Sequence, residues 1–401
     1  MEWITKGLDE VLFIQEGPGI RKYEYEDGGY PMINVRCVQD GYVDMSKSRS
    51  ANYELATTKW KHFQVEENDI LYTISGTIGR SAIVKKSDLP LLMNTSVVRF
   101  RSLTECLDTK FVYYAFKTDA FIKDLLGHST GTAIKNVGPS HLKKMIISYP
   151  EIPEQKRIVA LLDTVFADLE QTRSKTEKNL KNARELFDSY LQQVFSQKGE
   201  GWVEKTLKEA SIDFGRGKSK HRPRNDESLY GGEYPFVQTG DVRNCEHLIT
   251  KYSKTYNEVG LAQSKLWPKG TICITIAANI AETGILDFDS CFPDSVIGVV
   301  VNPEITTIPY VEFLLQSFKA ILQAKGKGSA QDNINMGTFE KLNFPFPSIN
   351  KQNEIVCSLN ELMISVQQLE VIYQKKLSSI GELKKSILQK AFSGELTTTD
   401  K

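Results

Sequence analysis

Five cations lie within nine residues of one segment of the chain. They are separated by glycine, serine, histidine and proline, and they are Arg216, Lys218, Lys220, Arg222 and Arg224. Lysine and arginine bind phosphate oxygens, and small residues between them let a nucleic-acid backbone come close. The cluster predicts a DNA-contacting loop, and the alternative is an ordinary solvated surface loop.

Two more loops combine small residues with hydrogen-bond donors, and each is expected to follow a helix. Their predicted DNA-contacting residues are Thr132 and Lys135 in the first loop, and Lys325, Lys327 and Ser329 in the second. The remaining residues of the predicted DNA-binding set are Arg21, Lys22, Gln238 and Thr239. Turn chemistry alone would explain the same residue types.

Motifs for catalysis are missing from the sequence. It has no G-x-G-x-x-G and no P-loop, and its five histidines show no metal-ligand spacing. NFPF at 343–346 resembles the N-P-P-aromatic motif of amino-methyltransferases but lacks the adjacent prolines, and its counterpart at 146–149 reads IISY. We therefore expect no catalytic residue, no metal site and no cofactor on this chain.

The composition is that of an ordinary globular protein. The 401 residues include 50 basic and 50 acidic side chains, so the formal net charge is zero, and 40% of residues are hydrophobic. Six scattered cysteines without a C-x-x-C pair indicate a reducing compartment. No signal sequence is evident, and no apolar run approaches the roughly 20 residues of a membrane span. We expect two or three domains, a cytoplasmic location and no membrane partner.

The chain is an internal repeat. PEIPEQKRIV at 150–159 matches PSINKQNEIV at 347–356, an offset of 197, and the offset persists to Phe195-Ser196 and Phe392-Ser393. Upstream, Tyr30-Pro31 matches Tyr234-Pro235 at an offset of 204. Two halves of about 200 residues therefore stand in tandem, each with a divergent front part and a back part of fixed length.

Each back part predicts one long helix. Apolar residues recur at alternating steps of three and four, which is a heptad seam. The predicted seam includes Leu162, Val165, Leu169 and Leu186 in the first copy, and Leu359, Leu362, Val366 and Leu383 in the second. Pro153 suits a first helical turn and Asn350 suits an N-cap, whereas Gly381 costs about 1 kcal/mol inside a helix. Two such stripes most simply bury each other as an antiparallel pair, although long heptad helices also serve as dimerisation elements.

Each front part mixes strands and helices. We expect strands at 69–74, 96–100, 271–276 and 295–301, and helices at 111–126 and 310–324, each followed by a loop. The predicted fold class is therefore α+β, with two pseudo-symmetric domains separated by an antiparallel two-helix coiled coil. The expected boundaries are 1–150 for the first domain, 151–197 for the first long helix, 198–347 for the second domain and 348–397 for the second helix.

This arrangement resembles the specificity subunits of type I restriction-modification systems. The resemblance spans the whole chain and rests on both copies of the P-E-I-P-E-Q pattern, on YPFVQTGDV at 234–242, on SGTIG at 75–79 and on the helix endings LQQVFS and LQKAFSGEL. The two copies differ at Val35-Arg36-Cys37 against Thr239-Gly240-Asp241, so no fixed role is carried onto those loops.

The resemblance implies a non-catalytic, sequence-specific DNA-binding subunit that reads a bipartite, asymmetric target. Its implied partners are double-stranded DNA, two adenine methyltransferase subunits, and restriction and translocase subunits that cleave with ATP. S-adenosylmethionine, ATP and magnesium would belong to those partners. Two rival hypotheses are a coiled-coil scaffold that binds no DNA and a self-contained DNA methyltransferase.

Overall fold

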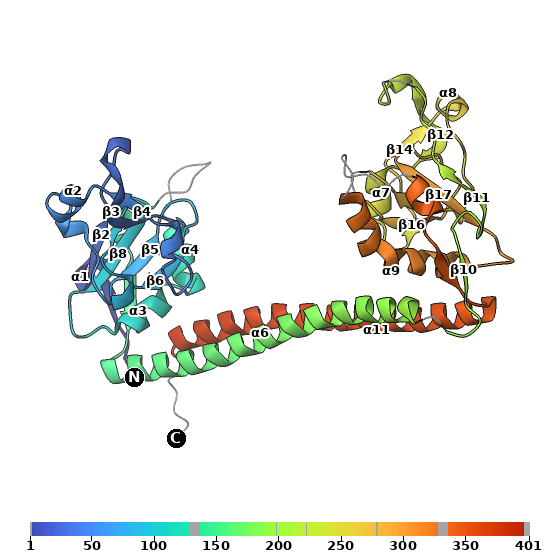
Figure 1. Ribbon diagram of the computed structural model, residues 1–401. Helices are drawn as coiled ribbons and strands as arrows, with labels where there is room; N and C mark the ends of the chain where they lie inside the picture. Colours follow the sequence, from blue (N-terminus) through green and yellow to red (C-terminus); the bar gives the residue numbers. More distant parts are fainter. Residues whose placement is uncertain are drawn as a thin grey trace. The chain divides into compact units, whose positions relative to one another are not determined.

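The computed structural model describes residues 2–127, 137–197, 199–221, 223–277, 280–327 and 336–396. Contacts divide the chain into two units. Unit 1 comprises 1–176 with 375–401, and unit 2 comprises 177–374. The division cuts through both long helices, because half of each helix packs with each α+β domain (Figure 1).

The domain of unit 1 is built on a four-stranded sheet in the order β2-β8-β5-β6, beside a three-stranded sheet β4-β3-β7 and a strand pair β1-β9. Its strands are β1 Ile4–Gly7, β2 Leu12–Glu16, β3 Tyr25–Ile33, β4 Arg49–Ala51, β5 Ile70–Thr73, β6 Ser81–Ile83, β7 Leu92–Met93, β8 Val97–Ser102 and β9 Ile146–Tyr149. Its helices are α1 Leu8–Val11, α2 Tyr53–Thr57, α3 Thr109–Ala115, α4 Asp119–Gly127 and α5 Pro139–Leu142. One apolar core joins the sheet to α3, α4 and the long helices.

The domain of unit 2 repeats this plan with a five-stranded sheet, β11-β17-β15-β16-β13, and strand pairs β12-β14 and β10-β18. Its strands are β10 Val203–Lys205, β11 Ser211–Arg216, β12 Tyr230–Phe236, β13 Leu248–Ile249, β14 Lys254–Tyr256, β15 Ile272–Thr275, β16 Thr283–Leu286, β17 Val296–Val301 and β18 Phe344–Phe346. Its helices are α7 Thr239–Arg243, α8 Glu258–Ala262, α9 Ile308–Lys327 and α10 Met336–Glu340.

The four strands expected from the sequence are present as β5, β8, β15 and β17. The single helix expected at 111–126 is wrong, because the chain forms α3 and α4 with a break at 116–118. At that break Thr118 Oγ1 donates to Ala115 O and accepts from Phe121 N. The threonine side chain thus replaces helical backbone bonds and starts a new helix.

The long helices are α6, Ile152–Ser196, and α11, Ile349–Phe392, and they pack side by side and antiparallel (Figure 1). In unit 1, Ile158 and Leu162 near the start of α6 share a core with Leu388 near the end of α11. In unit 2, Leu191 near the end of α6 shares a core with Leu359 near the start of α11. Early residues of each helix therefore meet late residues of the other, which confirms the expected antiparallel pair.

Three expectations about these helices are wrong in detail. Leu186 is 51% exposed and Leu383 is 48% exposed, so neither lies in the buried seam. Leu162 and Leu359 are fully buried, Val366 is 7% exposed, and Val165, Leu169 and Leu362 are half-buried. Asn350 is not an N-cap, because α11 begins at Ile349 and Ser348 Oγ accepts from Lys351 N. Pro153 does lie in the first turn of α6.

One buried glutamine anchors each long helix to its domain. Gln155 is fully buried; its Nε2 donates to Cys106 O and Pro150 O, and its Oε1 accepts from Asp108 N. Gln352, 197 residues later, donates to Ile305 O and Pro347 O and accepts from Thr307 N. Each amide satisfies backbone groups of two segments that precede the helix, so the helix start is fixed to its domain.

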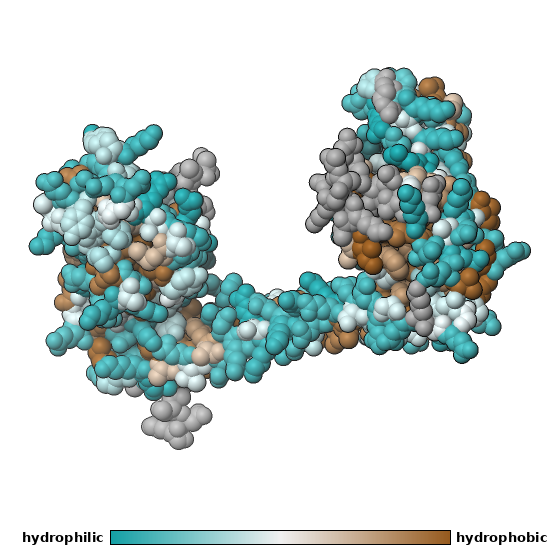
Figure 2. Space-filling model, in the orientation of Figure 1, coloured by the Kyte–Doolittle hydropathy of each residue, from teal (hydrophilic) through white to brown (hydrophobic). Residues whose placement is uncertain are grey.

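Among the described residues, α11 is the one helix long and apolar enough to cross a membrane by length and composition. An 18-residue stretch of it averages 1.3 in hydropathy, and 17% of that stretch is buried. The sequence analysis expected no apolar run near the length of a membrane span, and by length and mean hydropathy α11 corrects that expectation. Helices that pack against several neighbours pass the same test, and the visible face of the long helices in Figure 2 is mainly hydrophilic.

Candidate nucleic-acid interface

The basic segment of unit 2 leaves the end of β11, an edge strand of the five-stranded sheet. Arg216 is the last residue of β11, and Gly217 N donates to Val296 O beside it. A Cβ at Gly217 would lie 2.2 Å from Phe292 O, so only glycine fits at this turn. The glycine lets the chain leave the sheet directly into the basic loop.

The backbone of this loop is anchored by the residues that follow α8. Gln263 Oε1 accepts from the backbone nitrogens of Lys220 and His221, at 2.6 and 3.0 Å, and Ser264 Oγ donates to Lys218 O at 2.8 Å. Both lysine side chains are exposed. The loop therefore has a held backbone and presents Lys218 and Lys220 to solvent.

The arginines of the loop gather around Asp294. Arg216 Nε donates to Asp294 O at 2.6 Å, and Arg224 Nη2 donates to Asp294 Oδ2 at 2.7 Å. Lys218 and Lys220 form no ion pair within the described part of the chain, so they carry the loop's uncompensated charge. Arg222 lies outside the described residues.

A second carboxylate, that of Asp226, holds the C-terminal end of the loop through hydrogen bonds. Asp226 accepts from Ser228 through both the hydroxyl and the backbone nitrogen and lies 2.8 Å from His221 Nε2. The Ser228 hydrogen bonds, with a further contribution from His221, lower the pKa of Asp226 to about 2. Asp226 therefore stays ionised across the physiological range and caps the short 3-10 turn at 227–229.

The equivalent loop of unit 1 follows β2. Gly17 N donates to Val97 O, and a Cβ at Gly17 would lie 2.4 Å from Asn94 O, so the same glycine turn recurs. Arg21 and Lys22 are both exposed, and Arg21 Nη1 donates to the hydroxyl of Tyr23, which is 74% exposed. This loop carries two cations and an exposed aromatic ring, a combination suited to phosphate and base contact.

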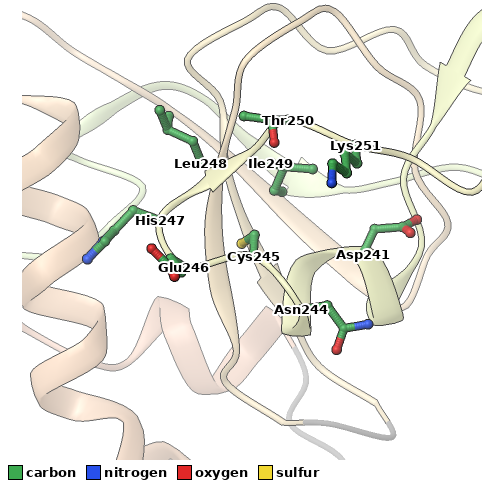
Figure 3. A pocket seen from close by; sticks show the side chains of 9 residues that line it. All are labelled: Asp241, Asn244, Cys245, Glu246, His247, Leu248, Ile249, Thr250 and Lys251. Carbon is green, nitrogen blue, oxygen red and sulfur yellow. The ribbon is translucent and has the colours of Figure 1, made fainter. Parts of the chain in front are cut away.

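Gln238 and Thr239 lie at the start of α7, and Asp241 of the same helix lines an open cavity of about 610 Å³ (Figure 3). Gln238 N donates to Asp241 Oδ2 at 2.8 Å. Asp241, Asn244 and Lys251 line this cavity with polar side chains. Burial, with a further contribution from Glu312, raises the pKa of Cys245 in the cavity wall to about 11, so its thiol stays protonated and is a poor nucleophile.

His247 connects this cavity to the helices behind it. Its Nδ1 lies 2.8 Å from the buried carboxylate of Glu312 on α9, and its Nε2 lies 2.9 Å from Met363 Sδ on α11. The hydrogen bond to Glu312 raises the pKa of His247, and burial opposes this effect. The contacts form a polar tie between the domain and the long helix.

The other expected residues are not tested by the structure. Thr132, Lys135 and Ser329 lie outside the described residues. Lys325 and Lys327 were expected in a loop after a helix, and this is wrong, because α9 continues to Lys327. Their side chains are not described.

Over the described ranges, no group of three or more His, Cys, Asp or Glu residues could hold a metal ion. The sequence reasoning missed Asp294 and Gln263, which hold the basic loop. A signal for Asp294 was present, since it directly precedes an expected strand. Gln263 had no such signal, because the contact joins residues more than 40 positions apart.

A family model described as the type I restriction modification DNA specificity domain matches residues 1–178 and 199–385. The chain belongs to this family. Among its relatives, the specificity subunit of the restriction enzyme EcoBI from Escherichia coli is 23% identical and covers 98% of this chain and 86% of its own length. The MjaIX specificity subunit from Methanocaldococcus jannaschii is 28% identical, with 98% and 94% covered.

Two solved structures share the fold. The HsdS subunit from Thermoanaerobacter tengcongensis has a TM-score of 0.66 at 18% identity, with 98% of this chain and 97% of that chain covered. A chain from a study of complex assembly and conformational transition of the type I R-M system has a TM-score of 0.75 at 17% identity, with 97% of both chains covered. The protein is thus a DNA specificity subunit of a type I restriction-modification system, and this family is non-catalytic within the complex.

Proposed function

We propose that this specificity subunit reads a bipartite, asymmetric DNA target and directs adenine methylation or ATP-dependent cleavage by its partner subunits. The observation that supports this is the duplication. Both units share a four-strand order (β2-β8-β5-β6 and β11-β17-β15-β16), the glycine turn at Gly17 and Gly217, and the buried glutamine at the start of the long helix. The loops that follow β2 and β11 nevertheless differ in length and charge. Equivalent scaffolds with unlike loops would read two unlike half-sites.

The proposed DNA contacts comprise both basic loops and the start of α7. Lys218 and Lys220 would contact phosphates, because they are exposed and uncompensated among the described residues. Arg216 and Arg224, held at Asp294, would be oriented for either phosphate or base edges. The full proposed set is Arg21, Lys22, Thr132, Lys135, Arg216, Lys218, Lys220, Arg222, Arg224, Gln238, Thr239, Lys325, Lys327 and Ser329.

The chemistry would come from partners. Two adenine methyltransferase subunits would supply S-adenosylmethionine, and restriction and translocase subunits would supply ATP and magnesium, in the cytoplasm where the DNA lies. An adenine must leave the base stack to be methylated, so the whole assembly would distort the duplex. We retain 1–150 and 198–347 as the recognition domains and 151–197 and 348–397 as the helical spacers.

A domain exchange tests the proposal. The chain would be expressed with its methyltransferase partner, and the methylated motif would be mapped by sequencing genomic DNA. Replacing 1–150 with the corresponding domain of another specificity subunit should change one half of the motif and leave the other half intact. A motif that changes in both halves, or in neither, contradicts the assignment of one half-site to each domain.

A further inference from the structure

An open groove lies in unit 1, where the domain meets the long helices. It measures about 470 Å³ and is lined by Arg80 from the domain, Phe166 from α6, and Gly381, Lys384, Lys385 and Leu388 from α11. Lys384 Nζ lies 5.1 Å from the centre of the Phe166 ring, so the ammonium group covers the apolar floor. The groove therefore has an apolar base under a cationic rim.

The rim charge is largely uncompensated. Arg80, Lys384 and Lys385 form no ion pair within the residues that the structure describes, whereas Lys117, also in the groove, pairs with Asp40. Three free cations on one groove of a chain with zero net charge indicate a polyanionic ligand.

Neither the packing around Gly381 nor its backbone conformation requires glycine at this position. It lies inside α11, and a Cβ built on it would meet no atom within 4 Å. Glycine weakens a helix interior relative to alanine, so a helix gains nothing from it here. The bare backbone leaves room for something outside the chain to approach α11 between the two groove walls.

In the second copy of the repeat, the positions equivalent to the groove residues carry other side chains, which make contacts within the protein. At the 197 offset, Gly381, Lys384 and Lys385 correspond to Arg184, Phe187 and Asp188. Arg184 pairs with Glu370 at 2.9 Å, and Phe187 packs on Phe313. Arg80 N donates to Thr73 Oγ1 just as Glu282 N donates to Thr275 Oγ1, so Glu282 occupies the place of Arg80. The fold does not require a cationic groove, because the described part of unit 2 carries Arg184, Phe187, Asp188 and Glu282 at these positions.

The loop after β2 carries fewer cations than the loop after β11. The loop after β2, at 17–24, has two, Arg21 and Lys22, whereas the loop after β11 has four, Lys218, Lys220, Arg222 and Arg224. The groove cations would give unit 1 additional contacts with the phosphate backbone.

We propose that Arg80, Lys384 and Lys385, with the bare backbone at Gly381, form a second contact with the DNA backbone beside the half-site of the first domain. This inference rests on the proposed function. The groove positions the duplex and does not read bases, because its cations would meet the phosphate backbone.

The test uses the full chain assembled with its methyltransferase subunits. Affinity is measured against salt concentration for a duplex carrying the methylated motif and for an unrelated duplex. Lys384→Ala with Lys385→Ala should reduce the slope of log affinity against log salt by about two on both duplexes. Lys375→Ala with Lys376→Ala, a pair of exposed lysines on the same helix outside the groove, should leave the slope unchanged.

Gly381→Gln supplies an independent readout. Glutamine favours helix over glycine, so thermal stability should rise or stay equal while DNA affinity falls several-fold because the groove is filled. An unchanged salt slope in the double lysine variant overturns the proposal. Loss of methyltransferase association with an unchanged slope also overturns it and assigns the groove to a protein partner. Preference for the methylated motif should be kept in every variant, and its absence in the unaltered complex would instead contradict the proposed function.

Discussion

Lys218 and Arg224 are neighbours in the basic loop, but they are held differently. Lys218 has an anchored backbone oxygen and an exposed, unpaired ammonium group among the described residues, whereas Arg224 is bound to Asp294. A free cation can displace a counterion condensed on a DNA phosphate, whereas a paired cation must first break its contact with the carboxylate. The lysines of the loop should therefore carry more of the salt-dependent affinity than its arginines.

Replacing Lys218 and Lys220 with alanine should reduce the salt slope of DNA binding by about two and weaken binding equally for all sequences. The measurement is a titration of the assembled complex at several salt concentrations. Lys178→Ala with Lys208→Ala, two exposed lysines of the same unit away from the loop, is the matched control. A lysine-loop variant that loses preference among sequences instead would show that these side chains read bases.

The buried glutamine at the start of each long helix, Gln155 or Gln352, fixes the helix to its domain through three hydrogen bonds to backbone groups. Gln155→Leu would leave Cys106 O, Pro150 O and Asp108 N without their partner. Each unsatisfied buried group costs about 1–3 kcal/mol, so the variant should lose about 3 kcal/mol or more of unfolding free energy. Urea unfolding followed by circular dichroism measures this. Gln171→Leu, at an exposed site of the same helix, should change the free energy of unfolding by less than about 0.5 kcal/mol. An equal loss in both variants would refute the stabilising role of the Gln155 hydrogen bonds.

At the scale of elements, the sequence predicted the long helices and four of the strands because their signals are local. The long helices follow from apolar spacings of three and four residues, and the four strands follow from short runs of β-branched and apolar residues. The seam failed at Leu186 and Leu383 because a strict heptad drifts against the 3.6-residue turn of a helix. Beyond Ala183 the buried positions proceed by fours to Leu191 and Phe195, which turns the face of α6 towards the domain core. This rotation of the buried face depends on tertiary contacts, which the spacing of apolar residues along one helix does not reveal.

Both units contain a polar contact between a loop and a helical segment. In unit 1, Asp40 of a loop pairs with Lys117 in the break between α3 and α4. In unit 2, His247 pairs with Glu312 on α9, while Thr283 and Gln316 also donate to that carboxylate. The contact in unit 2 contains an imidazole, which can titrate near neutral pH.

The His247 tie should make unit 2 sensitive to pH. The pKa of His247 is higher in the folded state, where Glu312 faces it from α9, Met363 from α11, and Glu246 and Cys245 from its own loop. Its contribution to stability is therefore fully present below the unfolded pKa of about 6.5 and is lost as pH rises through the higher folded value. Thermal melting across this range should show the loss, and His247→Gln should flatten it. A variant with the same pH profile as the unaltered chain would refute the tie.

At the scale of the whole molecule, the duplication was readable from sequence and the recognition surface was not. An offset of 197 residues that persists across both long helices requires two copies with helices of equal length. The loops diverge, and their working geometry depends on distant residues such as Gln263 and Asp294. Basic composition singled out the loop proposed for DNA contact in unit 2. The groove proposed in unit 1 joins positions about 300 residues apart and has no local signature in the sequence.

Equal helix lengths suggest that the antiparallel pair sets the gap between the half-sites. Because the partners run antiparallel, a matched deletion removes 173–179 from α6 and 371–377 from α11, seven residues from each. Seven residues shorten a helix by about 10.5 Å and rotate it by only about 20°, so the packing faces stay aligned. That length corresponds to about three base pairs at roughly 34 Å per helical turn of DNA. The methylated motif should keep both halves and lose about three base pairs from its gap, whereas deletion from one helix alone should mismatch the pair and abolish methylation. An intact gap after the matched deletion would show that the spacing is set by the partner subunits and not by these helices.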